Sequence, residues 1–232
     1  MTTTIDPQSF DHLAHRYDRY ADLVADELNA YLKFRLPRAA GRAVDLGCGT
    51  GVHTTLLAGH YNEVLAVDLS APMLALAGHR RPRSNVRYER RDLVDVTPWQ
   101  DGQFDLVFTA YTLHHLPDLE LALLEMRRLV RPGGQLIAVD VVDDRRLVPR
   151  AWFRREAVRT LRDDLRTRRR TARQAWELLR LQLDPAWLDH QTTDRLLPPA
   201  EWSAIGRRVL PDCTLTPLHR ALALAWTASS PL

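Results

Sequence analysis

The feature that most constrains the fold of this chain is a glycine-rich segment that follows a short apolar run. The run begins at Arg42, and the segment reads Val44-Asp-Leu-Gly-Cys-Gly-Thr-Gly51. A helical pattern follows over residues 52–60. Glycine lets the backbone turn sharply and lets a ligand approach it closely. A strand, a glycine loop and a helix in this order are typical of nucleotide-binding α/β proteins of several kinds.

The spacing of the glycines argues against two of these kinds. A dinucleotide-binding loop has the pattern G-x-G-x-x-G and holds a pyrophosphate at the N-terminus of its helix. Here the third glycine comes one residue early, at Gly51, and Val52 follows it. This spacing disfavours a pyrophosphate site. No Gly-Lys-Ser or Gly-Lys-Thr follows, so the segment is not a P-loop.

Strand and helix patterns alternate along the chain after this loop. A helix capped by Ser70 is predicted to begin near Pro72, and another is predicted over residues 119–130. The later strands are predicted at residues 63–68, 86–91, 104–110 and 135–142, with two more over 214–227. The alternation predicts an α/β fold with a Rossmann-like, doubly wound sheet. We expect the sheet to be mostly parallel, with a closing antiparallel strand and a helical cap insert.

Three acidic residues follow three successive strands of this sheet. Asp68 lies 17 residues after Gly51 at the end of the second strand, where a carboxylate can accept hydrogen bonds from both ribose hydroxyls. Asp92 follows the third strand, where its side chain could meet an adenine amino group. A single strand-end aspartate is often a solvated turn residue. Together with Asp45, the three acids indicate a nucleoside site at the carboxyl ends of the strands.

The composition is that of a globular protein, with 232 residues, 45% hydrophobic and 26% charged. We expect one α/β domain, free thiols at Cys48 and Cys213, no signal peptide and no apolar run of about 18 residues. These features predict a cytoplasmic protein without a membrane span. The net charge is +3, and Lys33 is the only lysine among 32 basic residues. This arginine bias resembles a GC-rich genome and weakens any argument from arginine to nucleic acid.

The ordered segments resemble the class I S-adenosylmethionine (SAM)-dependent methyltransferases, in particular the small-molecule, methyltransferase type 11-like branch. The resemblance covers about residues 10–142. It implies SAM as cofactor and S-adenosyl-L-homocysteine as product. The segments that carry it are Val44–Gly51, Leu65–Ser70, Arg91–Leu93, Phe104–Pro117 and Arg131–Leu136.

The resemblance implies roles at the methionine end of the cofactor. Asp45, Gly47 and Gly49 would hold the methionine part, and Ala110 would present its backbone to the methionyl amine. Tyr17 lies in a segment that resembles the family's N-terminal lid, which closes on the cofactor. The alternative for Tyr17 is ordinary helix packing.

The resemblance also implies roles at the nucleoside end. Asp68 would bind the ribose, and Leu69 and Met73 would flank the adenine. Asp92 would read the adenine amino group, with Leu93 beside it.

The candidate catalytic residues are His115 and His114, which follow the fourth strand. The methyl group of SAM is already activated, so a base is needed only when the nucleophile loses a proton. Histidine suits that role at neutral pH. Alternatively, both histidines are structural or belong to the cofactor pocket. His190 and His219 are further candidates for the base.

We predict no metal site, because the two histidines and Asp118 make no convincing ligand set. Asp140, in the fifth strand, would either face the substrate or pair with an arginine.

We divide the chain into four predicted parts. Residues 1–40 form an N-terminal helical lid, and residues 41–144 form the SAM-binding core. Residues 145–199 form a helical substrate-cap insert, and residues 200–232 form the final helix and closing β-hairpin of the core. Residues 145–180 have a helical pattern with 13 arginines and four acidic residues, whereas residues 183–199 are predicted to be less regular.

Two groups of side chains in the insert have open roles. Residues 166–170 would either meet an anionic substrate or form a solvated helix face. The aromatic residues would either line a pocket or pack the cap; they are Trp152, Phe153, Trp176 and Trp187.

The predicted function is methyl transfer from SAM to an oxygen or nitrogen of a small molecule in specialised (natural-product) metabolism. The acceptor is expected to be a small molecule, anionic or peptidic, and the protein a monomer or homodimer. One alternative is a methyltransferase acting on a peptide, a protein or RNA. Another is a SAM-binding cyclase or partner-binding protein without transfer. Nucleic acid is disfavoured, because residues 110–113 read Ala-Tyr-Thr-Leu instead of an Asn/Asp-Pro-Pro-Tyr motif.

Overall fold

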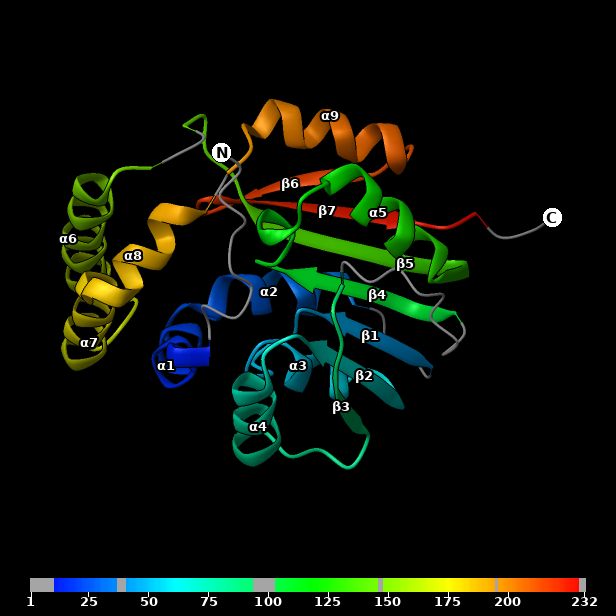
Figure 1. Cartoon of the computed structure of the whole chain (residues 1–232), viewed down its shortest axis with the longest axis horizontal. Helices are drawn as coiled ribbons and strands as arrows, with labels where there is room; N and C mark the ends of the chain where they lie inside the picture. The colour runs from blue at the N-terminus through cyan, green and yellow to red at the C-terminus, as the bar shows by residue number, and fades with distance from the viewer. Residues whose placement is uncertain (1–10, 37–40, 94–102, 146–147, 195, 230–232) are drawn as a thin grey trace.

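The computed structural model describes residues 11–36, 41–93, 103–145, 148–194 and 196–229. Its described strands form one seven-stranded sheet with the order β3-β2-β1-β4-β5-β7-β6 (Figure 1). Neighbouring strands from β3 to β5 are parallel, and β7 runs antiparallel to both β5 and β6. This confirms the predicted fold class. The strands are β1 Arg42–Leu46, β2 Glu63–Asp68, β3 Val86–Arg90, β4 Phe104–Ala110, β5 Val130–Val141, β6 Thr214–Leu218 and β7 Ala221–Thr227.

The strand order reverses direction next to β1, because β2 lies on one side of it and β4 on the other. The loops that leave β1 and β4 therefore separate at the carboxyl edge of the sheet. Ligands of open α/β sheets bind at this kind of switch point. The glycine loop and the loop with His114 and His115 both leave from it.

Helices cover both faces of the sheet. On one face, α2 (Asp26–Arg35) and α3 (Thr54–Ala58) bury Leu32 and Leu57 against the strands. On the other face, α5 (Leu119–Arg128) and α9 (Pro199–Val209) bury Leu123 and Trp202. Full burial of one leucine side chain stabilises the fold by roughly 1.5–3 kcal/mol. The two apolar layers hold the sheet rigid beneath the loops at its carboxyl edge.

A helical layer stands beyond the carboxyl ends of the strands (Figure 1). It consists of α6 (Arg150–Thr167), α7 (Ala172–Leu183) and α8 (Pro185–Thr193), all from the insert. The N-terminal α1 (Ala14–Val24) lies next to it. Arg19 on α1 donates hydrogen bonds of 2.5 and 2.9 Å to the carboxylate of Glu177 on α7. The N-terminal helix is thereby joined to the insert.

Several local predictions are confirmed. The strands over 42–46, 63–68 and 104–110 have the expected bounds. Ser70 caps α4 (Ala71–Arg80), because its side chain accepts a hydrogen bond from the Met73 backbone. The two closing strands meet at residues 219–220, as expected.

Two local predictions were wrong. Residues 183–199 were expected to be irregular, yet they contain α8, which Asp184 caps through the backbone N–H groups of Ala186 and Trp187. The strand β5 begins at Val130 instead of residue 135, and its pairing with β4 shifts register between Phe104 and Leu106. An irregular start to the strand was therefore mistaken for a turn.

None of the helices in the described ranges is both long enough and apolar enough to cross a membrane.

Candidate active site

The glycine loop adopts a backbone conformation that is unfavourable for residues with a Cβ atom. Gly47, Gly49 and Gly51 have φ angles of +73°, +53° and +78°. A Cβ atom on Gly47 would overlap the side chain of Thr112, which follows β4, and one on Gly49 would lie 3.2 Å from the Tyr17 ring. The backbone N–H of Gly47 also donates to the carbonyl of Val67 at 2.9 Å. The loop is thus held closely between β2, α1 and the loop after β4.

Asp68 lies at the end of β2 and is tied to the same loop. Its Oδ2 accepts a hydrogen bond of 2.8 Å from the Gly49 N–H, and its Oδ1 accepts one of 2.9 Å from the Ser70 N–H. Burial raises the pKa of Asp68, and these backbone donors oppose the rise. A carboxylate has about four acceptor positions. Asp68 can therefore still accept hydrogen bonds from a ligand.

Asp45 lies on β1 below the loop and is 2% exposed. The Thr54 hydroxyl donates to its Oδ2 at 2.6 Å. Burial raises the pKa of Asp45 to about 7, although the Thr54 hydrogen bond opposes the rise. The sequence suggested a ligand-binding carboxylate, and the structure adds a partner inside the protein, Thr54.

The residues expected at the nucleoside end surround the ends of β2 and β3. Met73 on α4 is buried, and Leu69 is half-buried with its carbonyl accepting from the Arg90 Nε at 2.9 Å. Asp92 is exposed, and Leu93 packs against the core. Residues 94–102 lie outside the described residues.

The other two expected cofactor residues flank the loop. Ala110 is buried at the end of β4, and its carbonyl accepts a hydrogen bond from Thr112 Oγ1 at 3.1 Å. Tyr17 on α1 lies against Gly49, with its ring centroid 6.1 Å from that of Trp187 on α8. Burial and the Asp68 carboxylate raise the pKa of Tyr17. Phe10, which begins the segment resembling a lid, lies outside the described residues.

An ion-pair network that the sequence analysis missed joins α1 to the glycine loop. Asp18 is 2% exposed and pairs with Arg80 and with Arg81, whose Nη1 lies 2.5 Å away. The same Nη1 donates to the Thr50 carbonyl at 2.8 Å, and Arg81 Nη2 lies 2.5 Å from Asp22. No short motif marks these residues, because α1 and α4 are far apart in the sequence.

His114 and His115 lie in a short 3₁₀ helix, η2 (Leu113–His115). His114 Nδ1 lies 2.6 Å from Asp140 Oδ1, and the His114 backbone N–H donates to Asp140 Oδ2 at 2.7 Å. Asp140, on β5, was expected to face the substrate or pair with an arginine; its partner is instead this histidine. Burial lowers the pKa of His114, but the charge and hydrogen bond of Asp140 outweigh that effect and raise it to about 9.

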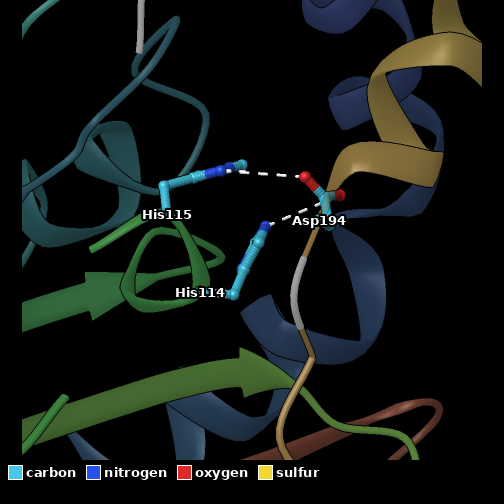
Figure 2. Close-up of side chains that lie close together, drawn as sticks. All are labelled: His114, His115 and Asp194. Carbon is cyan, nitrogen blue, oxygen red and sulfur yellow. Dashed lines mark ion pairs between the residues drawn. The ribbon is translucent and has the colours of Figure 1, made fainter. Parts of the chain in front are cut away.

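Asp194, which follows α8, completes the group (Figure 2). Its Oδ2 lies 3.9 Å from His114 Nε2, and its Oδ1 lies 3.8 Å from His115 Nδ1. Burial raises the pKa of Asp194 to about 6 against the effect of His114. Asp118, the acid that the sequence placed with these histidines, instead caps α5 by accepting from the Leu121 N–H at 3.0 Å.

The insert places further aromatic rings over this group. The His190 ring centroid lies 5.7 Å from that of His115 and 5.9 Å from that of Trp187. Burial and the His114 charge lower the pKa of His190 to about 4. Burial and the charges of His114 and His190 also lower the pKa of His115. His219, by contrast, is an exposed residue of the β6–β7 turn.

The aromatic and arginine residues of the insert differ in burial and in contacts. Trp187 and Phe153 are buried, whereas Trp176 is 51% exposed. Arg170 pairs with the buried Asp164 at 2.7 Å. Arg170 is therefore engaged within the cap.

The chain is similar to several known proteins. Residues 44–138 match a family model described as a methyltransferase domain. This segment of the chain is therefore similar to methyltransferase domains. A solved DhpI–SAH complex matches 100% of this chain and 100% of its own chain, with a TM-score of 0.66 and 27% identity.

Two curated relatives match part of the chain. The O-methyltransferase cnsE of Penicillium expansum is 33% identical over 130 residues, which are 53% of this chain and 47% of that protein. A demethylmenaquinone methyltransferase of Lactiplantibacillus plantarum is 32% identical over 157 residues, 62% of this chain and 65% of that protein. The match thus spans between about half and two thirds of the length of these relatives.

Proposed function

We propose that this chain transfers the methyl group of SAM to an oxygen or nitrogen of a small molecule. The observation that carries the proposal is the place of His115, on the loop after β4 and below the rings of α8. Its backbone N–H donates to the carbonyl of Thr112, the residue that packs against Gly47. His115, whose side chain can promote loss of a proton, is thus three positions after Thr112 in the sequence, and Thr112 contacts the glycine loop.

The residues around the glycine loop fit SAM. Gly47 and Gly49 let Thr112 and Tyr17 pack directly against the loop backbone, which a Cβ atom would prevent, and Asp68 keeps acceptor positions for ribose hydroxyls. In this proposal Leu69, Met73, Asp92 and Leu93 surround the adenine, and Asp45 and Ala110 lie at the methionine end. SAM supplies a methyl group on a sulfonium, which is already activated toward nucleophiles. The DhpI–SAH complex supports the same choice of cofactor.

In this proposal the protein orients the acceptor, excludes water from the reacting groups and promotes removal of the acceptor's proton. Tyr17 lies against Gly49 of the loop, and its ring centroid lies 6.1 Å from that of Trp187. In this proposal the two rings keep water from the reacting groups. Holding the acceptor in line with the methyl group can contribute about 7–11 kcal/mol. His115 promotes loss of the acceptor's proton, and its imidazole can do so by accepting that proton. Asp140 holds His114, and His114 packs on His115 with ring centroids 3.9 Å apart.

A small-molecule acceptor is supported by the relative named a demethylmenaquinone methyltransferase, and we propose a role in specialised metabolism. Another relative is named an O-methyltransferase, which favours an oxygen acceptor. The rings of Tyr20 and Trp187, with centroids 4.7 Å apart, offer apolar walls beside the histidines.

The test uses two variants with different expected effects. Asp68→Ala should weaken binding of SAM and of its product by about 10–100-fold, which calorimetry measures. His115→Ala should leave that binding near wild type and lower the turnover of labelled SAM with a panel of small hydroxyl and amino acceptors by about 10²–10⁴-fold. The reverse ranking would overturn these roles. Absence of SAM binding would refute the proposal, and binding without transfer would favour a partner-binding protein.

A further inference from the structure

The side chains of His114, His115 and Asp194 converge from two separate segments (Figure 2). Each offers one ligand atom, and these atoms all lie within 4.8 Å of one another. The histidines belong to η2 at the carboxyl edge of the sheet, whereas Asp194 follows α8 of the insert. The arrangement exists only because the insert folds back over the core.

The distances within this group are too long for hydrogen bonds. Asp194 lies 3.9 Å from His114 Nε2 and 3.8 Å from His115 Nδ1. Its Oδ1 is buried and has no hydrogen-bond partner among the residues that the structure describes. A buried polar atom without a partner costs roughly 1–3 kcal/mol. Zinc bonds to nitrogen and oxygen are about 2 Å long, so a cation between these atoms would satisfy the carboxylate after a small contraction of the group.

Asp140 prepares His114 for this role. Its Oδ1 lies 2.6 Å from His114 Nδ1, on the side of the ring opposite to Asp194. When a cation displaces the proton on Nε2 and Nδ1–H still donates to Asp140, the ring offers the cation the lone pair of Nε2, which faces Asp194. Histidines that bind metals usually donate their other N–H to a carboxylate in this way, and the partner orients the ring.

We propose that His114, His115 and Asp194 form a binding site for a divalent cation of the zinc class. Two imidazoles and one carboxylate suit zinc and its transition-metal neighbours better than magnesium or calcium, which prefer oxygen ligands. The sequence alone offered no convincing third ligand, because Asp118 is the acidic residue nearest to the two histidines along the chain. Asp194 supplies that ligand from the far end of the insert.

Three protein ligands leave one position of a tetrahedral ion open, as in catalytic zinc sites. The use of that position rests on the proposed function. An acceptor hydroxyl there would lose its proton to solvent more readily, and its oxygen would then bond to the methyl carbon as the S–C bond of SAM breaks. His115 would in this way promote proton loss through the ion. Cation binding itself does not depend on this role.

The test measures binding of Zn²⁺ by the full chain, freed of any histidine tag and treated with a chelator. We expect one Zn²⁺ per chain by elemental analysis, and a tetrahedral absorption spectrum when Co²⁺ replaces it. Asp194→Asn and His115→Ala should each weaken Zn²⁺ binding by at least 100-fold. Asp140→Asn should weaken it by about 10–100-fold. The matched control is His79→Ala, because His79 is an exposed histidine of α4.

Wild-type binding weaker than about 100 μM, or equal binding by wild type and a folded Asp194→Asn variant, would overturn the site. Circular dichroism establishes that each variant is folded. Calorimetry with SAM separates the two proposals. Loss of the zinc site with intact SAM binding leaves the proposed function standing, whereas zinc binding without SAM binding would refute the proposed function alone.

Discussion

The two halves of the candidate active site differ in how far apart their residues lie in the sequence. In the cofactor half, Gly47, Gly49 and Asp68 come from two neighbouring strand ends. In the acceptor half, His114 and His115 meet Asp194, which lies about 80 residues further along the chain. The first half is built by local backbone geometry and the second by the folding of the insert. Substitutions should therefore act locally in the cofactor half and through packing in the acceptor half.

The largest effect is expected from Gly47→Ala. The new Cβ atom would overlap Thr112, and the φ angle of +73° strains any side chain. We expect binding of S-adenosyl-L-homocysteine to weaken at least 1,000-fold, about 4 kcal/mol. Calorimetry measures it, with thermal unfolding to establish that the protein is folded.

A matched control exists in the same half of the molecule. A Cβ atom on Gly78, within α4, would meet nothing within 4 Å. Gly78→Ala should leave cofactor binding unchanged and raise helix stability by up to about 1 kcal/mol. Equal binding by the Gly47 and Gly78 variants would show that the loop geometry does not govern the cofactor half.

The next largest effect is expected on stability, at the ion pair between Asp18 on α1 and Arg81. Within the described residues, Asp18→Ala leaves Arg81, whose side chain is 11% exposed, with Asp22 as its one ionic partner. Removing one member of a buried ion pair is strongly destabilising. We expect the free energy of unfolding in urea to fall by about 3 kcal/mol.

The control for Asp18 is Arg128→Ala, since Arg128 pairs with Glu125 while 74% exposed. Exposed pairs contribute only about 0–1 kcal/mol. A similar loss of stability in both variants would contradict a special role for the Asp18 pair.

The smallest effect is a pH dependence at Asp45. Its pKa is about 7 in the folded protein, above the ordinary value of 3.8, so the folded state binds the proton more tightly than the unfolded state. The stabilisation is complete below pH 3.8 and is lost as the pH rises toward 7. Wild type should lose about 2 kcal/mol relative to Asp45→Asn between pH 5 and pH 7, as urea unfolding would measure.

The control for Asp45 is Asp105→Asn, because the pKa of Asp105 is shifted in the opposite direction. Burial raises the pKa of Asp105, but hydrogen bonds from Arg131 and the Arg42 backbone outweigh it and lower the pKa below 3.8. Its stabilisation is therefore present above pH 3.8, and no slope relative to wild type is expected between pH 5 and pH 7. A slope for Asp105 and none for Asp45 would reverse our interpretation of the two carboxyl groups.

The sheet and its glycine loop were predictable because their signals are short-range. The strand that ends at Leu46 and the one that ends at Asp68 could be located from runs of adjacent apolar residues. The cap of α8 at Asp184 and Pro185 was also present in the sequence, but it was overlooked because the helix is short and weakly amphipathic.

The remaining features depend on contacts between distant residues. Asp140 was known to lie in a strand, yet the choice of His114 as its partner depends on the register of β5 beside β4. Asp194 carries no local motif, and Asp118 was a closer candidate in the sequence. The pairing of Asp18 with Arg81 likewise depends on how α1 docks against α4. No spacing rule contains this information.

The position of Arg81 has a kinetic consequence. One guanidinium holds both the N-terminal helix, through Asp18, and the glycine loop, through the Thr50 carbonyl. Opening of the helix must break a buried ion pair and release the loop in the same event. The residence time of a ligand enclosed beneath Tyr17 would then depend on how often these Arg81 contacts break, and not on the ligand's own contacts. Salt would shorten the residence time only after water reached the buried ion pair.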